Sequence, residues 1–458
     1  MTGNEHNHIL HGPRTLSWHR RVWNLLTERP AYLFVTSFAS AILVGAGLLA
    51  LPVACSQGRL SLIDALFTST SAVCVTGLIV VDTGSVLSTF GEVVLLLLIQ
   101  MGGLGVMTIT TFLALVIGGD LGLRGEFAIR EMVREERCRS AIRLLRFIVL
   151  VTLLIEGVGF LCLWPAYISA GTNAGRAAYL ALFHSVSAFC NAGFSLHSDS
   201  LCGFADTPAI PLVVSALVIL GGLGFGVLYS SYAVLRHGRR NSFHATQVLW
   251  CTLALVALGT ALLAGIEAIP GAGGHGLSLL DAFFQSVTAR TAGFNTVDIA
   301  TLSTPSQEVL MGLMFIGAAP GSTGGGVKVT TLLVLIAVVA TVIRGRDDVV
   351  LARRRLAFET ISQAMALVLL GALLIAGAFL LLLISETASP RVLLFETVSA
   401  FGTVGLSLGA TAHLSVPGKL VIVAVMFAGR VGILTFLLLL RPRRRSRLRH
   451  PLAELVVG

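Results

Sequence analysis

The sequence predicts an all-α integral membrane fold: four helix–pore-helix–helix repeats in a pseudo-fourfold arrangement around one pore. The first observation is composition. Of the 458 residues, 55% are hydrophobic and only 12% are charged, and the mean hydropathy is +0.88. So few charges could not cover the surface of a soluble protein of this length. The second observation is a short motif that occurs four times, and such repetition in a membrane chain indicates a ring built from one polypeptide.

The repeated motif ends on a glycine that stands ten residues after a phenylalanine. Its four copies are Phe67–Gly77, Phe183–Gly193, Phe283–Gly293 and Phe395–Gly405. Two short side chains lie six and five positions before each glycine, and a bulky apolar residue follows it. Each copy lies between two long apolar segments. The pattern therefore predicts a membrane helix, a short helix, a glycine loop and a second membrane helix in each quarter of the chain.

Eight apolar segments are long enough to cross a bilayer, which takes about 20 residues. They lie at 31–54, 90–117, 144–168, 208–235, 245–267, 306–343, 358–384 and 415–440. We expect only the sixth to be clearly broken, because Pro320 and several glycines interrupt it. The predicted units are a cytoplasmic segment at 1–30, repeat 1 at 31–117, repeat 2 at 118–235, repeat 3 at 236–343, repeat 4 at 344–440 and a basic tail at 441–458.

Positive charge is concentrated on alternate connections. Most of the 32 Lys and Arg residues lie in the stretches 1–30, 118–146, 236–244, 344–355 and 441–449. Excess positive charge stays on the cytoplasmic side, so we expect a multi-pass protein of the cell (inner or plasma) membrane with both termini in the cytoplasm. The four glycine motifs would then face outside. The Arg-rich tail predicts contact with anionic membrane lipids, and nucleic-acid binding is the weaker interpretation.

The short helices carry start signals. Ser61 with Asp64, and Ser278 with Asp281, match a variant of the capping box. A helix of about ten residues cannot span a bilayer, so the chain must enter the membrane and turn back, which is tolerated only inside protein or beside a water-filled cavity. The carboxyl ends of these helices would favour cations, and carbonyl groups of the four loops would replace an ion's hydration shell.

Acidic residues follow three of the four glycines: Asp82, Asp199 and Asp298. They would concentrate cations at an outer mouth, or they are ordinary solvated loop acids, and the sequence favours neither interpretation. The fourth copy has only His413 in this region. The seven Cys residues show no metal-binding spacing, and no nucleophile–base pair or cofactor motif is present. We therefore expect no enzyme activity and no cofactor on this chain.

Six stretches together resemble one known family: 71–83, 100–108, 288–296, 321–331, 399–407 and 429–436. At these residues the chain resembles the Trk/Ktr/HKT superfamily of potassium transporters, most closely its KtrB membrane subunits. The resemblance implies a potassium filter made by backbone carbonyls of Val75, Thr76, Gly77, Asn191, Ala192, Gly193, Thr291, Ala292, Gly293, Thr403, Val404 and Gly405. No copy carries the longer TVGYG sequence of potassium channels, so we expect fewer carbonyl rings. Leu408 departs from the small polar residue expected after the fourth loop.

The resemblance also assigns a gate to residues 318–328, which interrupt the sixth apolar segment. The gate residues are Gly321, Ser322, Thr323, Gly324, Gly325, Gly326, Lys328 and, from the last segment, Arg430. A simple kink is the alternative for this stretch, and the spacing of its glycines and lysine does not match a phosphate-binding loop. Arg430 would resist resting cations, or it forms a salt bridge between helices. Arg290 is expected to brace its loop against a carboxylate, and Glu156 has no clear role.

The implied assembly is a homodimer that binds a cytosolic RCK-type (regulator of potassium conductance) ring, with ATP or ADP bound to that ring. Potassium is the implied substrate, and sodium coupling is left open. The predicted function is therefore the pore-forming subunit of a bacterial potassium uptake system. The alternative is a secondary cation transporter with alternating access, which would show inverted repeats and paired broken helices.

Overall fold

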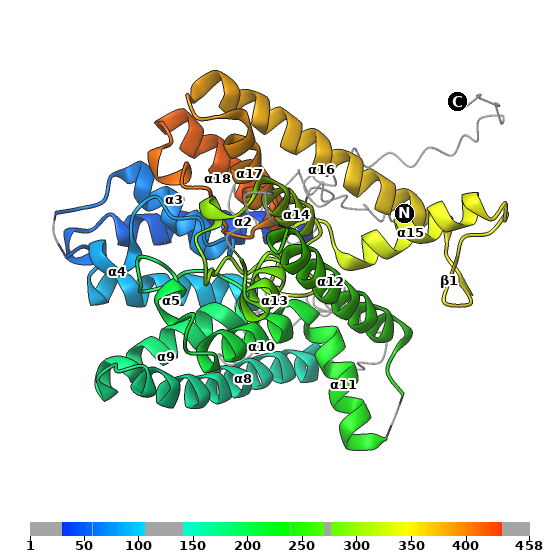
Figure 1. Ribbon diagram of the computed structural model, residues 1–458, viewed down its shortest axis with the longest axis horizontal. Coiled ribbons are helices and arrows are strands. Elements are labelled where there is room, and N and C mark those ends of the chain that lie inside the picture. The colour runs from blue at the N-terminus through cyan, green and yellow to red at the C-terminus, as the bar shows by residue number, and fades with distance from the viewer. Residues whose placement is uncertain (1–29, 57, 106–140, 239, 270–275, 433–458) are drawn as a thin grey trace, which may run out of the picture.

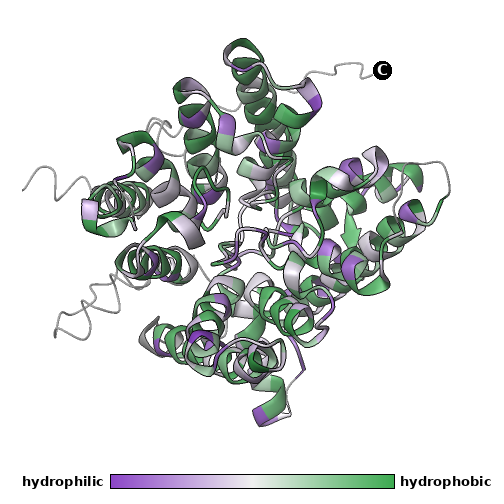
Figure 2. Cartoon of the chain, turned by 60° about the vertical axis from the view of Figure 1, so that its left-hand side comes forward, coloured by the Kyte–Doolittle hydropathy of each residue, from purple (hydrophilic) through white to green (hydrophobic). Residues whose placement is uncertain are grey.

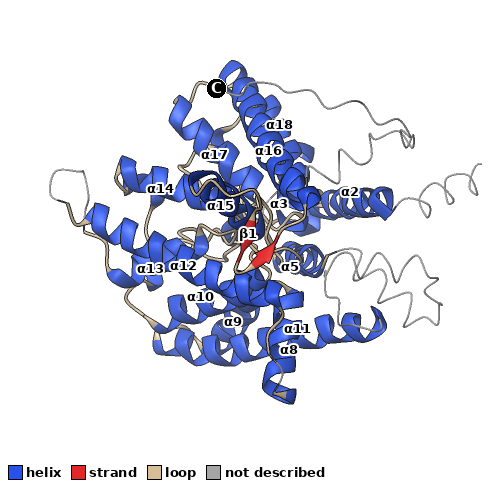
Figure 3. Cartoon of the chain, turned by 90° about the vertical axis from the view of Figure 1, so that its right-hand side faces the viewer, coloured by secondary structure: helices blue, strands red, loops and turns tan. Residues whose placement is uncertain are grey.

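The computed structural model describes residues 30–56, 58–105, 141–238, 240–269 and 276–432. The predicted basic tail, nearly all of segment 1–30 and most of the loop 118–146 lie outside these residues. The regular elements of the described chain are helices joined by loops, together with one hairpin of β1 (Val350–Leu351) and β2 (Arg354–Arg355), whose strands Figure 3 draws in red. Figure 1 shows the helices grouped around a centre of loops.

The elements follow in a recurring order along the chain. The first quarter contains α2 (Pro30–Leu49), η1 (Pro52–Ala54), α3 (Leu62–Val73), α4 (Thr83–Val86) and α5 (Thr89–Leu104). The second contains α8 (Ala141–Ser169), α9 (Ala174–Phe189), η2 (Cys202–Phe204), α10 (Ala209–Leu223) and α11 (Phe225–His237). The third contains α12 (Phe243–Glu267), α13 (Leu279–Thr288), η3 (Ile299–Thr301), α14 (Thr304–Phe315) and α15 (Val329–Ile343). After the hairpin, the fourth contains α16 (Phe358–Ser385), α17 (Pro390–Gly402), η4 (Thr411–His413) and α18 (Val416–Val431). Helix α18 packs against α3, so the last quarter adjoins the first.

The predicted starts of two short helices are confirmed. The Ser61 side chain accepts a hydrogen bond from the Asp64 N–H at 3.1 Å, and Ser278 accepts one from the Asp281 N–H at the same distance. In both helices the serine hydroxyl also donates to the carboxylate of the aspartate. These short-range contacts satisfy N–H groups that the first helical turn leaves without a partner.

Three described helices are long and apolar enough to cross a membrane: Leu145–Ser169, Phe243–Glu267 and Phe358–Ser385. A fourth span is formed if α10 and α11 are taken together. Four shorter apolar helices also occur, at Val35–Leu49, Leu62–Val73, Thr89–Leu104 and Val329–Ile343. Two of the eight predicted spans, 90–117 and 415–440, run into residues outside the described part. Figure 2 shows hydrophobic residues over much of the helical periphery, as lipid contact requires.

The expectation that only the sixth segment is broken is wrong. The fourth segment, predicted as continuous over 208–235, bends by 100° between α10 and α11. Gly224 at the bend has φ +85°, and a Cβ there would lie 2.8 Å from the Pro320 carbonyl oxygen. The N–H of Phe225 donates to the Gly321 carbonyl oxygen at 3.1 Å. The helix therefore breaks where the 318–328 loop approaches it and replaces a helical hydrogen bond.

One packing contact recurs between the long and short helices of the first three quarters. A serine of the short helix donates to a carbonyl of the long helix, and a glycine one turn further along the long helix leaves room for that serine. The three pairs of donor and acceptor residues are Ser69–Ile42, Ser185–Glu156 and Ser286–Val256. The glycines are Gly45, Gly159 and Gly259, and a Cβ on each would lie within 2.5 Å of the serine Oγ. Small residues at such contacts let membrane helices approach closely.

Helix α12 offers a matched test of this contact. Gly259→Ala should lower stability by about 1–3 kcal/mol, because the added methyl overpacks the site beside Ser286. Gly265→Ala lies in the same helix with nothing within 4 Å of the new Cβ, and should be neutral or stabilising by about 0.5–1 kcal/mol. Thermal unfolding of the purified variants in one detergent measures both. Equal melting temperatures would refute the packing role of Gly259.

Candidate functional site

Each motif glycine ends a loop with unusual backbone angles. We use "glycine loops" for the four segments Val75–Gly77, Asn191–Gly193, Thr291–Gly293 and Thr403–Gly405. The first residue of each loop has a positive φ, at 56°, 59°, 85° and 50°, and the glycines have φ of 87°, 69°, 82° and 96°. Positive φ is uncommon for β-branched residues such as valine and threonine. Such strain persists only where the surroundings enforce it, and it clusters at functional sites.

The four motif glycines contact one another in a closed cycle. A Cβ on Gly77 would come within 2.5 Å of the Ala192 carbonyl oxygen, and one on Gly193 would approach the Ala292 oxygen as closely. The cycle continues from Gly293 to the Val404 oxygen and from Gly405 back to the Thr76 oxygen. In each case the added Cβ would also lie 3.0–3.2 Å from the Cα of the next motif glycine. The structure therefore brings the twelve residues predicted from the sequence together at one place, with no room for a side chain at the glycines.

The small residue six positions before the glycine braces three of the loops. Ser71 accepts from the Gly77 N–H at 3.1 Å and donates to the Leu78 carbonyl at 2.7 Å. Ser187 donates to the Phe194 carbonyl at 2.8 Å, and Ser399 accepts from the Gly405 N–H at 3.1 Å. The third copy has Val287 here, and its Gly293 N–H bonds instead to the Thr288 carbonyl at 3.3 Å.

Sequence reasoning missed Glu396, a fully buried carboxylate in α17. It accepts hydrogen bonds from the Ser407 hydroxyl at 2.6 Å, the Leu408 N–H at 3.0 Å and the Thr411 hydroxyl at 2.5 Å. Because Leu408 contributes its backbone N–H to this network, its departure from a small polar residue leaves the bracing intact. The signal that could have revealed Glu396 is its place directly after the motif phenylalanine.

His184 occupies the same place after the phenylalanine of the second copy and was missed as well. Its ring nitrogens lie 2.9 Å from the Leu180 carbonyl oxygen and 3.0 Å from the Ser195 hydroxyl. The ring of His197, in the loop that follows, stacks on it with 5.6 Å between centroids. Burial lowers the pKa of His197, so this ring is neutral near pH 7. His184 and Glu396 thus hold, in equivalent ways, the segments that follow two of the glycine loops, through the serine two positions after each motif glycine.

Two of the three acidic loop residues cap short helices. Asp82 accepts from the Gly84 N–H at 3.1 Å and from the Ser85 hydroxyl at 2.8 Å. Asp298 accepts from the Ala300 N–H at 3.0 Å. Hydrogen bonds of this kind are typical of capping residues. They give both carboxylates a structural role that neither sequence interpretation included.

The 318–328 loop packs directly on the glycine loops. The Gly325 N–H donates to the Thr403 hydroxyl at 2.9 Å, and a Cβ on Gly324 would lie within 2.5 Å of the Thr291 hydroxyl. Lys328 donates to the carbonyl oxygens of Gly324 at 2.6 Å and Gly325 at 3.2 Å. The lysine therefore holds its own loop together, which further weakens any analogy with a phosphate-binding loop.

Arg430 links the 318–328 loop to another part of the molecule. It lies at the end of α18, and its guanidinium donates to the Thr323 carbonyl oxygen and to the Gly102 carbonyl oxygen at the end of α5. Within the described residues no carboxylate lies within ion-pair distance of Arg430. Arg430 therefore does not form the interhelical salt bridge considered for it; its guanidinium instead connects two backbone carbonyl groups by hydrogen bonds.

The predicted carboxylate partner of Arg290 is also not found, so that expectation is wrong. Arg290 is buried, and its Nη1 donates to the Thr252 carbonyl oxygen at a long 3.4 Å. No acidic side chain of the described chain pairs with it. The sequence could not show that the third glycine loop faces α10 and α12 at Arg290.

Glu156, whose role was open, accepts a hydrogen bond from the Gln100 side chain at 3.3 Å, and its carboxylate lies 3.9 Å from the Cys190 sulfur.

Comparison with known proteins identifies the family. The family model described as TrkH, cation transport protein, matches residues 15–447. The Ktr system potassium uptake protein B of Vibrio alginolyticus is 39% identical over 435 residues, which are 93% of this chain and 94% of that protein. The protein of the same name from Bacillus subtilis (strain 168) is 37% identical over 440 residues, 94% of this chain and 97% of that one. The crystal structure of the potassium transporter TrkH from Vibrio parahaemolyticus has the same fold, with a TM-score of 0.69 at 21% identity over 90% of this chain and 85% of that chain. The resemblance inferred from the sequence is thus confirmed, and the chain belongs to the TrkH family of cation transport proteins.

Proposed function

We propose that this chain is the pore-forming membrane subunit of a bacterial potassium uptake system. The closed cycle of contacts among Gly77, Gly193, Gly293 and Gly405 is the observation that carries the proposal. It supports four loops around one pathway, with four repeats in a pseudo-fourfold arrangement. Potassium as the substrate is supported by the names of the two most similar relatives reported above.

The filter of this pathway consists of the backbone carbonyls of the four glycine loops. Each loop follows directly on the carboxyl end of a short helix, namely α3, α9, α13 or α17. That end carries partial negative charge, so four such ends around one point favour a cation. Carbonyl oxygens can replace a cation's hydration shell without any charged side chain. Sodium is then excluded from the filter, transported together with potassium or a modulator of potassium flux, depending on how tightly the four loops hold their spacing.

The 318–328 loop is the gate of the pathway. Its contacts with Thr291 and Thr403 lie against two glycine loops. Arg430 of α18 holds the loop from outside through the Thr323 carbonyl oxygen, and Lys328 braces it from within. Hydrogen bonds from two cationic side chains can be broken and re-formed without unfolding any helix. A loop fixed in this way suits a switch between closed and open arrangements.

An alternating-access transporter is the second candidate. It is favoured by one observation, namely that two apolar segments are broken, between α10 and α11 and between α14 and α15. Paired broken helices are typical of such transporters. Counterflow at a membrane potential clamped to zero separates the two candidates in proteoliposomes: an alternating-access protein still accelerates tracer uptake when unlabelled potassium is trapped inside, whereas an open pathway shows no such acceleration, because its flux follows the electrochemical gradient alone.

Growth under potassium limitation tests the proposed function directly. A bacterial strain that lacks its own potassium uptake systems should grow at low potassium when it carries this chain together with a regulator subunit. The Gly293→Val variant, expressed to the same level, should fail to support growth. If the wild-type chain reached the membrane and restored no growth, the assignment of potassium uptake would be wrong.

The assembly is proposed to be a homodimer in the cytoplasmic (inner or plasma) membrane, with both termini inside and a cytosolic RCK-type ring bound to its basic loops. The basic stretches at 236–244 and 344–355 support this orientation and supply charge for docking. The dimer should co-purify with the ring at moderate salt, and flux through the dimer–ring complex should differ between ATP and ADP. A folded dimer that bound no ring, with no effect of either nucleotide, would indicate an unregulated pathway.

A further inference from the structure

The residue that follows the buried phenylalanine of each short helix is polar and is itself buried. In three quarters this phenylalanine is the motif phenylalanine, whereas in the third it is Phe284, because Phe283 is only partly buried. The serine that bonds to the long helix supports this alignment, since Ser69, Ser185 and Ser286 each come next in the chain. The four polar residues are 0–2% exposed, and they are Thr68, His184, Gln285 and Glu396. Equivalent positions of the four repeats thus carry four different side chains.

Within the described residues, only His184 and Glu396 bond to the segment that follows their own glycine loop. The His184 ring lies 3.0 Å from the hydroxyl of Ser195, and Glu396 accepts a hydrogen bond from the hydroxyl of Ser407 at 2.6 Å. Both serines stand two positions after the motif glycine. Glu396 accepts two further hydrogen bonds from the same segment. We call the contacts His184–Ser195 and Glu396–Ser407 the loop tethers.

The first and third quarters have no such tether in the part of the chain that the structure describes. In the first, Ile79 replaces the serine, and the buried hydroxyl of Thr68 has no hydrogen-bond partner there. In the third, Asn295 replaces it and donates to the Val297 carbonyl oxygen at 3.0 Å, while neither polar atom of the Gln285 amide has a partner in the described structure. Buried polar groups normally have partners, so the first and third segments are held less firmly than the second and fourth.

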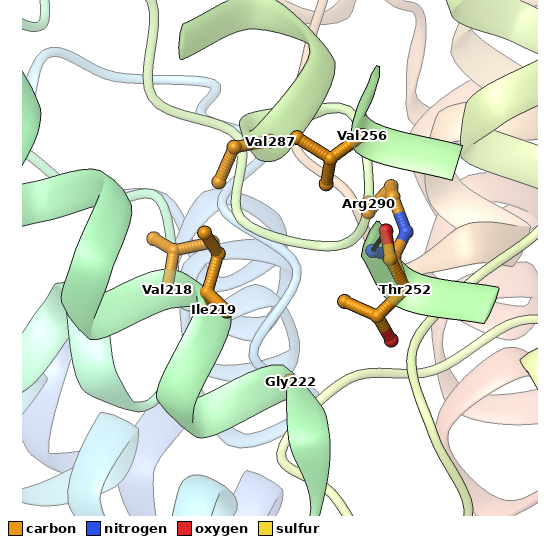
Figure 4. Close-up of a pocket in the computed structure, with 7 residues that line it drawn as sticks. All are labelled: Val218, Ile219, Gly222, Thr252, Val256, Val287 and Arg290. Atoms are coloured by element: carbon orange, nitrogen blue, oxygen red, sulfur yellow. Dashed lines mark hydrogen bonds between the residues drawn. The ribbon is translucent and has the colours of Figure 1, made fainter. Parts of the chain in front are cut away.

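The third glycine loop also has unfilled space beside it. Figure 4 shows a cavity between α10 and α12, with Val287 and Arg290 of the third motif in its wall. Its volume is about 10 Å³. Atoms along the wall of a cavity have fewer packing contacts than atoms in a filled core. Packing therefore does not replace the missing tether in this quarter.

The two tethered loops lie opposite each other. The cycle of contacts runs from Gly77 to Gly193, then to Gly293 and Gly405, and back to Gly77. The second and fourth loops are therefore opposite, and so are the first and third. Carbonyl oxygens that replace a hydration shell must keep their spacing if they are to distinguish potassium from the smaller sodium ion. A firmly held pair of opposite loops can fix that spacing even when the other pair is softer.

We propose that the loop tethers set the ion selectivity of the filter, with His184 and Glu396 as positioning residues for the second and fourth glycine loops. Neither side chain needs to touch the ion, because each acts through the serine that follows its loop. Since this role requires the filter proposed above, it rests on the proposed function. It adds a twofold element to the fourfold ring, in which one pair of loops is firm and the other is softer.

The test compares Glu396→Met with Thr68→Val by tracer flux of potassium and sodium into proteoliposomes, normalised to the amount of folded protein. Both variants replace a buried polar side chain at nearly constant volume in equivalent positions, and only Glu396→Met removes a tether. The ratio of potassium to sodium flux should fall about fivefold to tenfold in Glu396→Met, the factor that corresponds to one or two buried hydrogen bonds. It should fall likewise in His184→Phe and stay at the wild-type value in Thr68→Val.

Glu396→Gln separates the hydrogen bonds of the tether from the charge of the carboxylate. The glutamine amide oxygen still accepts from Ser407 and Leu408, so this variant should keep the wild-type flux ratio. A fall as large as in Glu396→Met would assign selectivity to the charge and refute the positioning role. If Glu396→Met does not fold, Ser407→Ala removes the same tether and should lower the ratio in its place.

Two further results would overturn the proposal: an unchanged flux ratio in both tether variants, Glu396→Met and His184→Phe, or an equal loss in Thr68→Val. The wild-type flux distinguishes these results from a failure of the proposed function. A wild-type chain that carried no potassium would contradict the proposed function and the tethers' role together. A potassium-selective wild-type chain whose tether variants were equally selective would contradict the role of the tethers alone.

Discussion

Replacement of Gly293 by valine is expected to abolish potassium uptake or to remove its selectivity over sodium. The glycine has φ +82°, and a Cβ there would lie within 2.5 Å of the Val404 carbonyl oxygen, a proposed potassium ligand. Strain in this conformation alone costs about 1–3 kcal/mol, and each 1.4 kcal/mol corresponds to about tenfold in an equilibrium. Displacement of the Val404 carbonyl adds to the cost of this strain. Potassium flux should therefore fall at least tenfold, or the pathway should lose its preference for potassium over sodium.

The matched control is Gly377→Val in α16. A Cβ at Gly377 has nothing within 4 Å, so potassium uptake should stay close to that of the wild type. Tracer flux of potassium and sodium into proteoliposomes, normalised to the amount of folded protein, compares the two variants. Normal selectivity in Gly293→Val would argue against a shared ring of four loops, because the ring requires the same close approach at every glycine.

Deletion of residues 321–326 is expected to raise cation flux and to remove its control. These residues contribute the carbonyl groups that Lys328 and Arg430 hold, and the Gly325 N–H that bonds to Thr403. Without them the proposed pathway lacks its obstruction. Arg430→Ala should act in the same direction but more weakly, since it frees the Thr323 carbonyl and removes one positive charge while the loop remains.

Proteoliposome flux with and without a regulator ring measures both changes. Arg391→Ala is the control for removal of an arginine, because Arg391 donates to Thr304 at an exposed site away from the 318–328 loop. Its flux should match the wild type. A loop deletion that is correctly folded and inactive would instead favour the interpretation of residues 318–328 as a structural kink.

The sequence predicted those features that depend on neighbouring residues. The two capping boxes at Ser61 and Ser278 act within one helical turn, so composition and spacing suffice to place them. The motif glycines were found because the motif occurs four times, and glycine is required at its end because it combines positive φ with close approach of another loop without strain. The sequence therefore located the four loops that the structure brings into contact.

Features that depend on distant segments were not predictable in this way. The bend at Gly224 requires the 318–328 loop to supply the partner of the Phe225 N–H, and nothing within 208–235 shows that this loop approaches. The environment of Arg290 depends likewise on the apolar faces of α10 and α12. Glu396 was overlooked because its partners Ser407 and Thr411 are brought back to it by the turn of the fourth loop.

Cations are proposed to pass through the cycle formed by the four glycine loops. Rubidium replaces potassium in most potassium pathways and scatters anomalously, so its position in crystals of this protein tests the claim most directly. We expect a rubidium peak enclosed by the carbonyl groups of all four glycine loops, absent when sodium replaces rubidium. A protein that transports rubidium in proteoliposomes and shows no peak within this cycle, or shows one elsewhere along the chain, would contradict it.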